Sequence, residues 1–216
     1  MQLLKELNIN PKDISLYKTA FTHTSYSNEH SNCESYERLE FLGDAVLELI
    51  ISDYLYNEKH LEEGTMTKMR SSYVCEEACA TYSSDLGFDK YIRLGSGENG
   101  ASVTILADVF ESFIGATYLD QGFDFTSKLV LKVITKYINK GVDFLHDYKS
   151  ELQELVQTVK KSVIYEVIDE KGPAHDKVFT CQVKVDDIIM GVGTGTSKKS
   201  AEQQAAKVAL SKQVKM

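Results

Sequence analysis

Four carboxylates recur at steps of three and four residues within positions 36–48: Glu37, Glu40, Asp44 and Glu48. In an α-helix this spacing places them on one face, opposite a run of leucines. Like charges so placed repel by roughly 0.2–0.5 kcal/mol per pair, and the middle of the stripe lacks the lysines that usually relieve the repulsion. Most acidic helix faces are only solvated surface, so the stripe by itself leaves two readings open.

A second acidic pair, Asp108 and Glu111, lies one turn apart within residues 106–116, which are otherwise almost all apolar or small. A helix this hydrophobic should be largely buried, where an unpaired carboxylate is costly. No Lys or Arg lies between Arg93 and Lys128 to neutralise the pair. A hard divalent cation held by oxygen ligands would do so. Carboxylates from two helices converging on Mg²⁺ would indicate phosphoryl chemistry, with water activation and stabilisation of the leaving oxygen.

The elements that must position these acids are predicted to be helical as far as about residue 139. Apolar residues recur at three- and four-residue steps in 39–50 and 106–114. A last helix over about 127–139 should stop at Lys140 and Gly141, and residues 141–147 resemble a short tether. Breaks between helices are expected at Gly64, at Gly87, in the 95–100 loop and at Gly122.

The periodicity changes in the last 70 or so residues. An amphipathic helix is expected around Leu152–Val159, and residues 178–185 alternate between apolar and polar, which is typical of a half-buried strand. Residues 162–169 and 188–193 are also extended in character, and a final helix should begin near Lys198. The pattern predicts a small unit of one helix, three strands and a second helix.

The composition of the chain is typical of a globular protein and argues against a disordered or membrane-spanning one. The chain has 216 residues, with 43% hydrophobic and 26% charged, as in ordinary globular proteins. No apolar run approaches the roughly 18–20 residues that span a bilayer, and the N-terminus lacks a signal-peptide core, so a cytosolic protein is expected. Four scattered cysteines are expected to be reduced. The net charge of −8 is unevenly divided: residues 1–147 hold 13 basic and 23 acidic side chains, and residues 148–216 hold 11 and 9.

The segment 37–44, Glu-Arg-Leu-Glu-Phe-Leu-Gly-Asp, resembles the signature motif of the ribonuclease III family. Segments 23–29, 63–67 and 106–111 resemble its other blocks, in the same order. The resemblance implies an all-helical endonuclease domain that works as a homodimer, with two active sites facing a shared RNA-binding valley. One departure is the loop 97–104, which lacks the basic residue often found before the second acidic block.

The resemblance also implies a role for individual residues. Glu40, Asp44, Asp108 and Glu111 match the catalytic cluster that binds Mg²⁺, for which Mn²⁺ should substitute, and Asp44 and Glu111 match its catalytic members. Glu37 and Glu63 match secondary acids that line the valley. Phe41 matches an aromatic residue that packs across the dimer interface, with packing in its own core as the alternative.

Three polar surfaces mark the C-terminal unit. The first helix presents Lys149, Gln153 and Gln157 at four-residue steps; the turn 171–175 contains His175; and Lys198 and Lys199 stand at a helix start, where free N–H groups and lysines favour phosphate. Together they resemble a double-stranded RNA-binding domain, which reads two minor grooves and the phosphates between them. The resemblance assigns the glutamines and His175 to the two grooves and Lys198 and Lys199 to the phosphates.

The predicted fold is therefore mainly α: an all-helical endonuclease domain at 1–143, a linker at 144–147, and a small α-β-β-β-α RNA-binding domain at 148–216. The resemblance implies an endoribonuclease that cuts both strands of duplex RNA with Mg²⁺, leaves 5′-phosphate and 3′-hydroxyl ends with a short 3′ overhang, and processes ribosomal RNA precursors and other structured transcripts. Its partners would be duplex RNA and a second copy, with no membrane and no small-molecule substrate.

Two alternative functions are weighed against this one. A non-catalytic RNA-binding relative would tend to lose one of the four acids, and all four are present. A helical Mg²⁺ enzyme acting on a small diphosphate would not explain residues 148–216.

Overall fold

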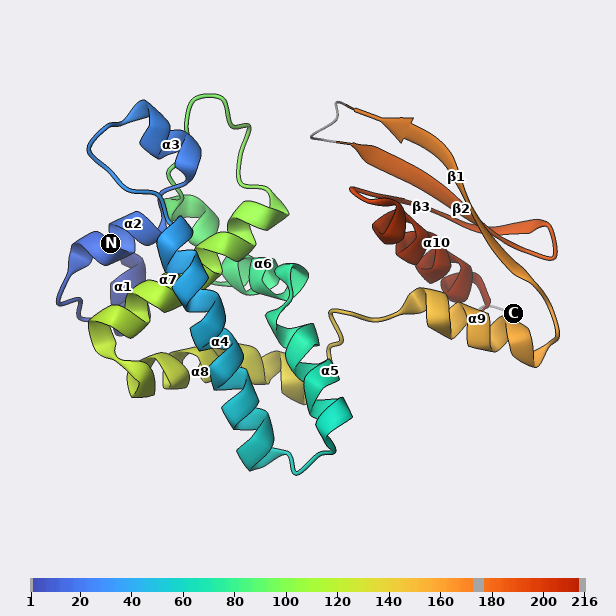
Figure 1. The fold of residues 1–216 in the computed structure, drawn as a ribbon, viewed down its shortest axis with the longest axis horizontal. Coiled ribbons are helices and arrows are strands. Elements are labelled where there is room, and N and C mark those ends of the chain that lie inside the picture. Colours follow the sequence, from blue (N-terminus) through green and yellow to red (C-terminus); the bar gives the residue numbers. More distant parts are fainter. Residues whose placement is uncertain (1, 173–176, 214–216) are drawn as a thin grey trace. The chain divides into compact units, whose positions relative to one another are not determined.

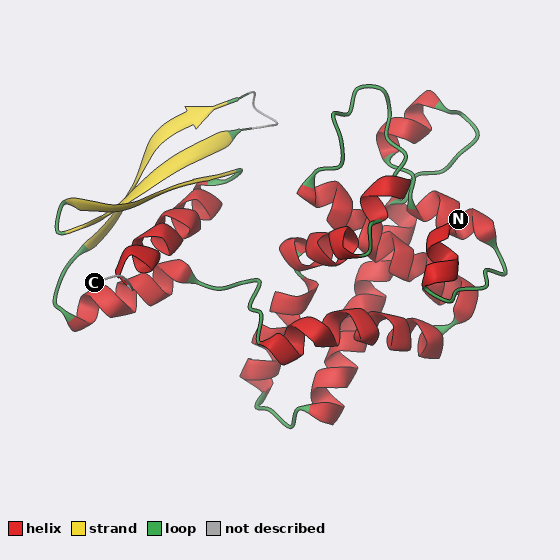
Figure 2. Cartoon of the chain, turned by 180° about the vertical axis from the view of Figure 1, so that it is seen from behind, coloured by secondary structure: helices red, strands yellow, loops and turns green. Residues whose placement is uncertain are grey.

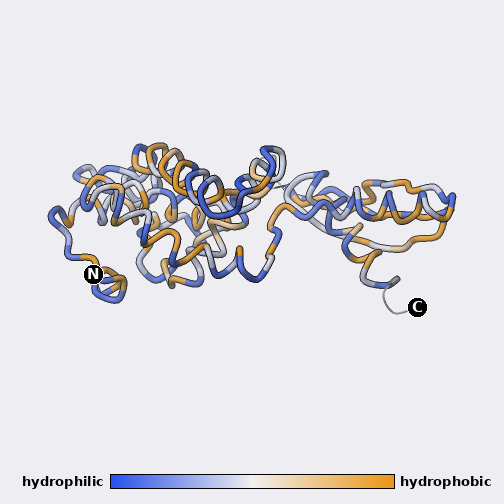
Figure 3. The backbone as a smooth tube through the Cα atoms, turned by 90° about the horizontal axis from the view of Figure 1, so that it is seen from below, coloured by the Kyte–Doolittle hydropathy of each residue, from blue (hydrophilic) through white to orange (hydrophobic). Residues whose placement is uncertain are grey.

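The computed structural model describes residues 2–172 and 177–213, and the chain divides into two compact units between Leu145 and His146 (Figure 1). Among the described residues, strands occur only in the second unit, and the first is built from helices (Figure 2). The predicted fold class, a helical part followed by a small α+β part, is confirmed. In both units hydrophobic and hydrophilic residues alternate along the helices (Figure 3), which is the pattern of helices with one face in a core.

The helices of the first unit are α1 (Gln2–Glu6), α2 (Ile14–Ala20), α3 (Thr24–Glu29), α4 (Glu37–Glu58), α5 (Glu63–Val74), α6 (Glu76–Asp85), a 3-10 turn η1 (Phe88–Tyr91), α7 (Val103–Gln121) and α8 (Phe123–Lys140). The expected breaks at Gly87 and Gly122 are confirmed, with φ of 67° and 83°. The expected break at Gly64 is wrong. The chain turns at residues 59–62, and Gly64 lies in the first turn of α5, where N–H groups lack helical partners in any case.

The two acid-bearing helices, α4 and α7, cross at two glycines. A Cβ atom on Gly43 would lie 1.8 Å from the carbonyl oxygen of Glu111, and one on Gly115 would lie 2.3 Å from that of Leu39. Any side chain at either position would push the helices apart, so glycine permits direct backbone contact. The contact sets the backbone of Glu111 against the residue that precedes Asp44.

Aromatic rings fill the core of the first unit beside this crossing. The ring of Phe88 lies 5.1 Å from that of Phe21 and 4.9 Å from that of Phe113, edge to face in both cases. The same core holds one buried acid that the sequence did not single out. Asp120 of α7 is 4% exposed and accepts hydrogen bonds from the hydroxyl of Tyr17 and from two backbone N–H groups that precede α2. It is a structural carboxylate, because polar groups inside the protein supply its partners.

The second unit consists of α9 (Tyr148–Thr158), β1 (Val163–Lys171), β2 (Val178–Val185), β3 (Ile188–Gly195) and α10 (Lys198–Gln213). The strands form one antiparallel sheet in the order β1-β2-β3. β2 has the predicted bounds, while β1 and β3 each run two residues further than predicted. Pairing with β2 extends them, since Lys171 pairs with Val178 and Gly195 with Phe179.

A close contact between β3 and α10 fixes the layers of this unit. A Cβ atom on Gly191 would lie 2.2 Å from the carbonyl oxygen of Ala205, and one on Gly193 would lie 2.3 Å from the backbone nitrogen of Ala205. Leu152 and Val156 of α9 are buried in the same core. The sheet and the two helices therefore form two layers, and the start of α10 is held at a defined place beside the end of β3.

Candidate active site and nucleic-acid interface

The crossing of α4 and α7 brings the two acidic segments together. Glu40 and Asp44 stand one turn apart on α4, as do Asp108 and Glu111 on α7. Carboxylates on one helix shift the pKa of those on the other. Asp108 raises the pKa of Glu40, and Asp44 and Glu40 raise the pKa of Glu111. Glu40, Asp108 and Glu111 are half-buried, and Asp44 is exposed to solvent. The sequence pattern placed each pair on a helix, and the fold places the pairs side by side.

Burial is the main reason why Glu40, Asp108 and Glu111 resist ionisation. It raises the pKa of Glu111 to about 8 and that of Glu40 to about 7, and neighbouring carboxylates add to both shifts. Burial also raises the pKa of Asp108, partly offset by a hydrogen bond from Tyr36. The charged groups that act on Glu40 and Glu111 are all carboxylates. The cluster therefore has the oxygen donors and the excess negative charge that fit a divalent cation.

The carboxylates neighbour one another without converging on one point. Among residues 2–172 and 177–213, no three His, Cys, Asp or Glu side chains are arranged to hold a metal ion as they stand. Two further groups lie at the cluster, and the sequence assigned neither of them to it. The hydroxyl of Tyr36 donates to Oδ2 of Asp108 at 2.9 Å. The buried thiol of Cys79 lies near Glu111 and partly offsets the rise in the pKa of that carboxyl.

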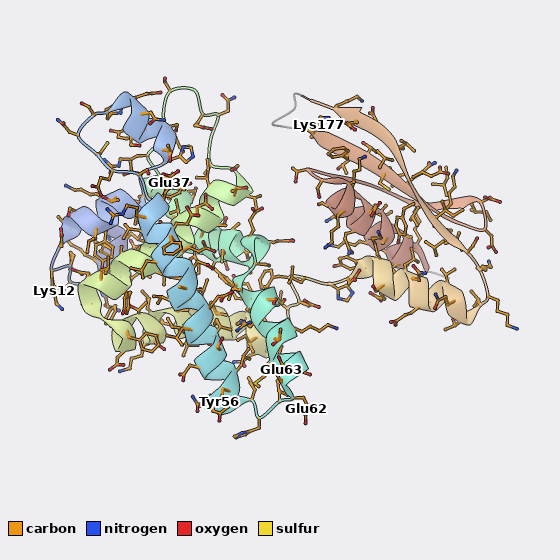
Figure 4. The ribbon with its side chains drawn as sticks, in the orientation of Figure 1. Lys12, Glu37, Tyr56, Glu62, Glu63 and Lys177 are labelled. Carbon is orange, nitrogen blue, oxygen red and sulfur yellow. The ribbon has the colours of Figure 1, made fainter. Side chains whose placement is uncertain are left out.

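The two secondary acids lie at opposite ends of α4 (Figure 4). Glu37 is exposed in its first turn, and Glu63 is exposed at the start of α5, after the turn that follows α4. Within one chain, the fold therefore leaves Glu63 away from the four-acid cluster. It lines instead a cavity of about 460 Å³ between α4 and α5, together with Leu49, Tyr56, Met66 and Arg70.

One side of α4 exposes large apolar residues. The side chain of Phe41 is 82% exposed, so packing within its own core is excluded. Leu49 (56% exposed) and Tyr56 (72%) follow at steps of eight and seven residues, which keeps all three on one side of the helix. A second hollow of about 390 Å³ adjoins Leu49. We call Phe41, Leu49 and Tyr56 the α4 face; an exposed apolar patch of this kind is typical of a protein–protein interface.

The second unit keeps most of the predicted RNA contacts on its surface. Gln153 and Gln157 are exposed on α9, and Lys198 and Lys199 are exposed in the first turn of α10. His175 lies outside the described residues. Lys149 differs: its ammonium pairs with Glu202 at 2.5 Å and lies 4.7 Å above the ring of Tyr165. This lysine holds α9 against α10, and its contact with RNA stays a prediction.

Comparison with known proteins agrees with both units. A sequence model of the ribonuclease-III-like family matches residues 13–138, and one of the double-stranded RNA binding motif matches residues 148–213. Ribonuclease 3 of Listeria monocytogenes serotype 4a (strain HCC23) is 48% identical, over 97% of this chain and 95% of the relative. Ribonuclease 3 of Aster yellows witches'-broom phytoplasma (strain AYWB) is 43% identical, over 99% and 91%.

A solved structure matches the first unit. The nuclease domain of ribonuclease III from Campylobacter jejuni superposes with a TM-score of 0.58 at 34% identity, covering 62% of this chain and 95% of that domain. In the described part of the chain, no helix is both long and apolar enough to cross a membrane. The acid cluster at the helix crossing, the family match over more than half of the chain and the near full-length relatives agree: the chain belongs to the ribonuclease III family, with a nuclease domain followed by a double-stranded RNA-binding domain.

Proposed function

We propose that the protein is a Mg²⁺-dependent endoribonuclease that hydrolyses both strands of duplex RNA. The observation that carries this proposal is the cluster at the α4–α7 crossing, in which half-buried carboxylates are surrounded by other carboxylates rather than by lysine or arginine. Such a cluster costs free energy unless a cation compensates it. A protein that only bound RNA would gain nothing from this cost.

Glu40, Asp44, Asp108 and Glu111 would hold the ion, and Mn²⁺ would be accepted because it prefers the same oxygen donors. When bound, Mg²⁺ supplies a lowered pKa for an attacking water and neutralises charge that develops on the scissile phosphate. The carboxylates fix where the ion sits, and the exposed position of Asp44 keeps the site open to a phosphodiester. Water adds to phosphorus and the bond from phosphorus to the 3′ oxygen breaks, which leaves a 5′-phosphate and a 3′-hydroxyl.

The α4 face is proposed to be the interface of a homodimer. The Campylobacter jejuni nuclease domain is described as having a region involved in dimer formation. A two-fold axis across α4 would run the two copies of this helix in opposite directions, so the start of α5 in one copy would approach the first turn of α4 in the other. That arrangement would bring Glu63 of one copy close to the first turn of α4 in the other copy. The RNA-binding valley would then be formed by both chains together. Two sites, one for each strand, would give the short 3′ overhang.

Phe41→Ala should weaken this dimer. Truncation of a central aromatic residue at an interface costs about 2 kcal/mol or more, which is roughly a 30-fold rise in the dissociation constant. Sedimentation across a dilution series measures it. Leu145→Ala is the matched control, because Leu145 is 51% exposed but lies outside the α4 face. Sedimentation of Phe41→Ala identical to that of the wild type at every concentration would exclude Phe41 from the interface.

The second unit is proposed to hold the duplex. Gln153 and Gln157 would contact one minor groove, and Lys198 and Lys199 the phosphates. Their charge acts locally, because at physiological salt a Debye length of about 8 Å screens most of the acidic nuclease domain. Long helical transcripts, ribosomal RNA precursors among them, would be the substrates.

Lys198→Ala with Lys199→Ala should weaken binding of every duplex sequence alike. The salt dependence of binding should fall by about one unit of slope for each phosphate that the protein no longer neutralises, while the rate at saturating RNA changes little. Lys160→Ala with Lys161→Ala is the control, since it removes the same charge from another exposed part of the same unit. An equal loss of affinity in the control would show that net charge, rather than the start of α10, determines binding.

The proposed activity is tested directly with a long RNA duplex. We expect cleavage with Mg²⁺ or Mn²⁺ and none with EDTA, and sequencing of the products should show 5′-phosphates and staggered ends. Single-stranded RNA of the same sequence should stay intact. Tight duplex binding without cleavage in Mg²⁺ would instead support the non-catalytic RNA-binding alternative.

A further inference from the structure

Tyr36 lies directly before α4 and is fixed there by its backbone. Its N–H donates to the carbonyl of Thr22 at 2.9 Å, and its own carbonyl accepts from the N–H groups of Leu39 (2.8 Å) and Glu40 (2.9 Å). The side chain is only 2% exposed. A residue held by three backbone hydrogen bonds and buried in this way has little freedom to reorient its ring.

The phenol of Tyr36 connects the start of α4 to the second acidic helix, α7. Its hydroxyl donates to Oδ2 of Asp108 at 2.9 Å, across 72 positions of sequence. Within the described part of the chain, no other group donates a hydrogen bond to this carboxylate. One oxygen of Asp108, Oδ2, is therefore engaged by the protein, and no described group hydrogen-bonds the other, Oδ1.

The ring of Tyr36 is supported on a further side by His23. The two rings lie 5.7 Å apart and are inclined by 50°. His23 is itself fixed, because its Nδ1 accepts from the backbone N–H of Ser25 and caps α3. The phenol is thus held by α3 and by the start of α4, and its hydroxyl contacts α7.

We propose that Tyr36 is a positioning residue of the cation site, which holds Asp108 in one orientation and so sets the affinity for the ion. The inference rests on the metal site proposed above and adds a residue outside its four carboxylates. Carboxylates that ligate metals are commonly hydrogen-bonded themselves, and loss of such a partner typically costs about 10–100-fold in affinity or activity. A phenol suits this place, because it donates a hydrogen bond without adding a charge to a cluster that is already negative.

The chain contains a matched pair that serves as a control. The hydroxyl of Tyr17 donates to Oδ2 of Asp120, also on α7 and also at 2.9 Å. Both tyrosines are buried, and Asp120 follows Asp108 by 12 residues, which is roughly 18 Å along a helix. Tyr17→Phe and Tyr36→Phe therefore remove the same phenol–carboxylate hydrogen bond from the same helix, and only the second does so at the acid cluster.

The test measures Mn²⁺ binding to the full chain by calorimetry, independently of cleavage. We expect Tyr36→Phe to raise the dissociation constant for Mn²⁺ by about 10–100-fold, and Tyr17→Phe to leave it unchanged. Thermal unfolding of both variants reports the structural loss they share. In a parallel cleavage assay, Tyr36→Phe should need more Mg²⁺ for half-maximal rate and recover the wild-type kcat when Mg²⁺ is in excess.

Two results would overturn the positioning role and spare the metal site. One is a wild-type Mn²⁺ affinity in Tyr36→Phe. The other is an equal loss of affinity in Tyr17→Phe, which would mean that loosening α7 anywhere weakens the site. Failure of the metal site itself has a different signature: the wild-type chain would bind no Mn²⁺, and Glu111→Gln would leave cleavage intact.

Discussion

Glu111→Gln is expected to reduce cleavage of duplex RNA by about 10³-fold or more while duplex binding stays close to that of the wild type. The amide keeps the size of the side chain and removes the charge of the most buried acid in the α4–α7 cluster. Metal-ion catalysis is worth several kcal/mol of transition-state stabilisation, and each 1.4 kcal/mol or so corresponds to a factor of ten in rate. Binding should persist because the contacts that hold the duplex lie largely in the second unit. Single-turnover cleavage and filter binding measure the two effects separately.

Glu48→Gln is the control for this variant. It removes one charge from the same helical stripe, one turn beyond Asp44, and Glu48 is exposed to solvent. We expect its cleavage rate to match that of the wild type. Cleavage by Glu111→Gln at a wild-type rate in Mg²⁺ would contradict the assignment of the four acids as a metal site.

The stability of the metal-free nuclease domain is expected to fall as the pH rises from about 5 to 9. In the folded chain the pKa of Glu40 is raised to about 7 and that of Glu111 to about 8, from an ordinary value of 4.5. The folded state therefore holds protons that the unfolded chain releases, so the stability that they contribute is complete below pH 4.5 and is lost as the pH passes 7 and 8. Calorimetric unfolding in EDTA across this range measures the loss.

Glu111→Gln should flatten this profile. One pKa unit corresponds to about 1.4 kcal/mol, so removal of the titrating group should stabilise the metal-free protein at pH 8.5 by about 1–3 kcal/mol. That change corresponds to a rise of roughly 2–4 °C in Tm for each kcal/mol. Mg²⁺ should stabilise the wild type at this pH and have much less effect on the variant. Parallel profiles for Glu111→Gln and Glu48→Gln would mean that Glu111 is not the group responsible.

The amino-acid sequence by itself determined the local elements and the residues able to do chemistry. Alternating apolar residues defined β2 to the residue, and glycine with a preceding lysine marked the end of α8 at Lys140. These features depend on contacts only a few residues apart, so a periodic pattern is sufficient to predict them. The break expected at Gly64 was wrong because a glycine is compatible with a turn but does not require one.

Tertiary structure decided which of these residues share a site. Two glycines without side chains let α4 and α7 touch, and that contact places four acids from distant segments together. Periodicity could not distinguish Asp120, satisfied by backbone N–H groups and a tyrosine, from Asp108, which has a single phenol as its donor among the described residues. Nor could it show that Phe41 points to solvent or that Glu63 lies away from the cluster. Burial and hydrogen bonding depend on which segments pack together, and packing joins residues that are far apart in the chain.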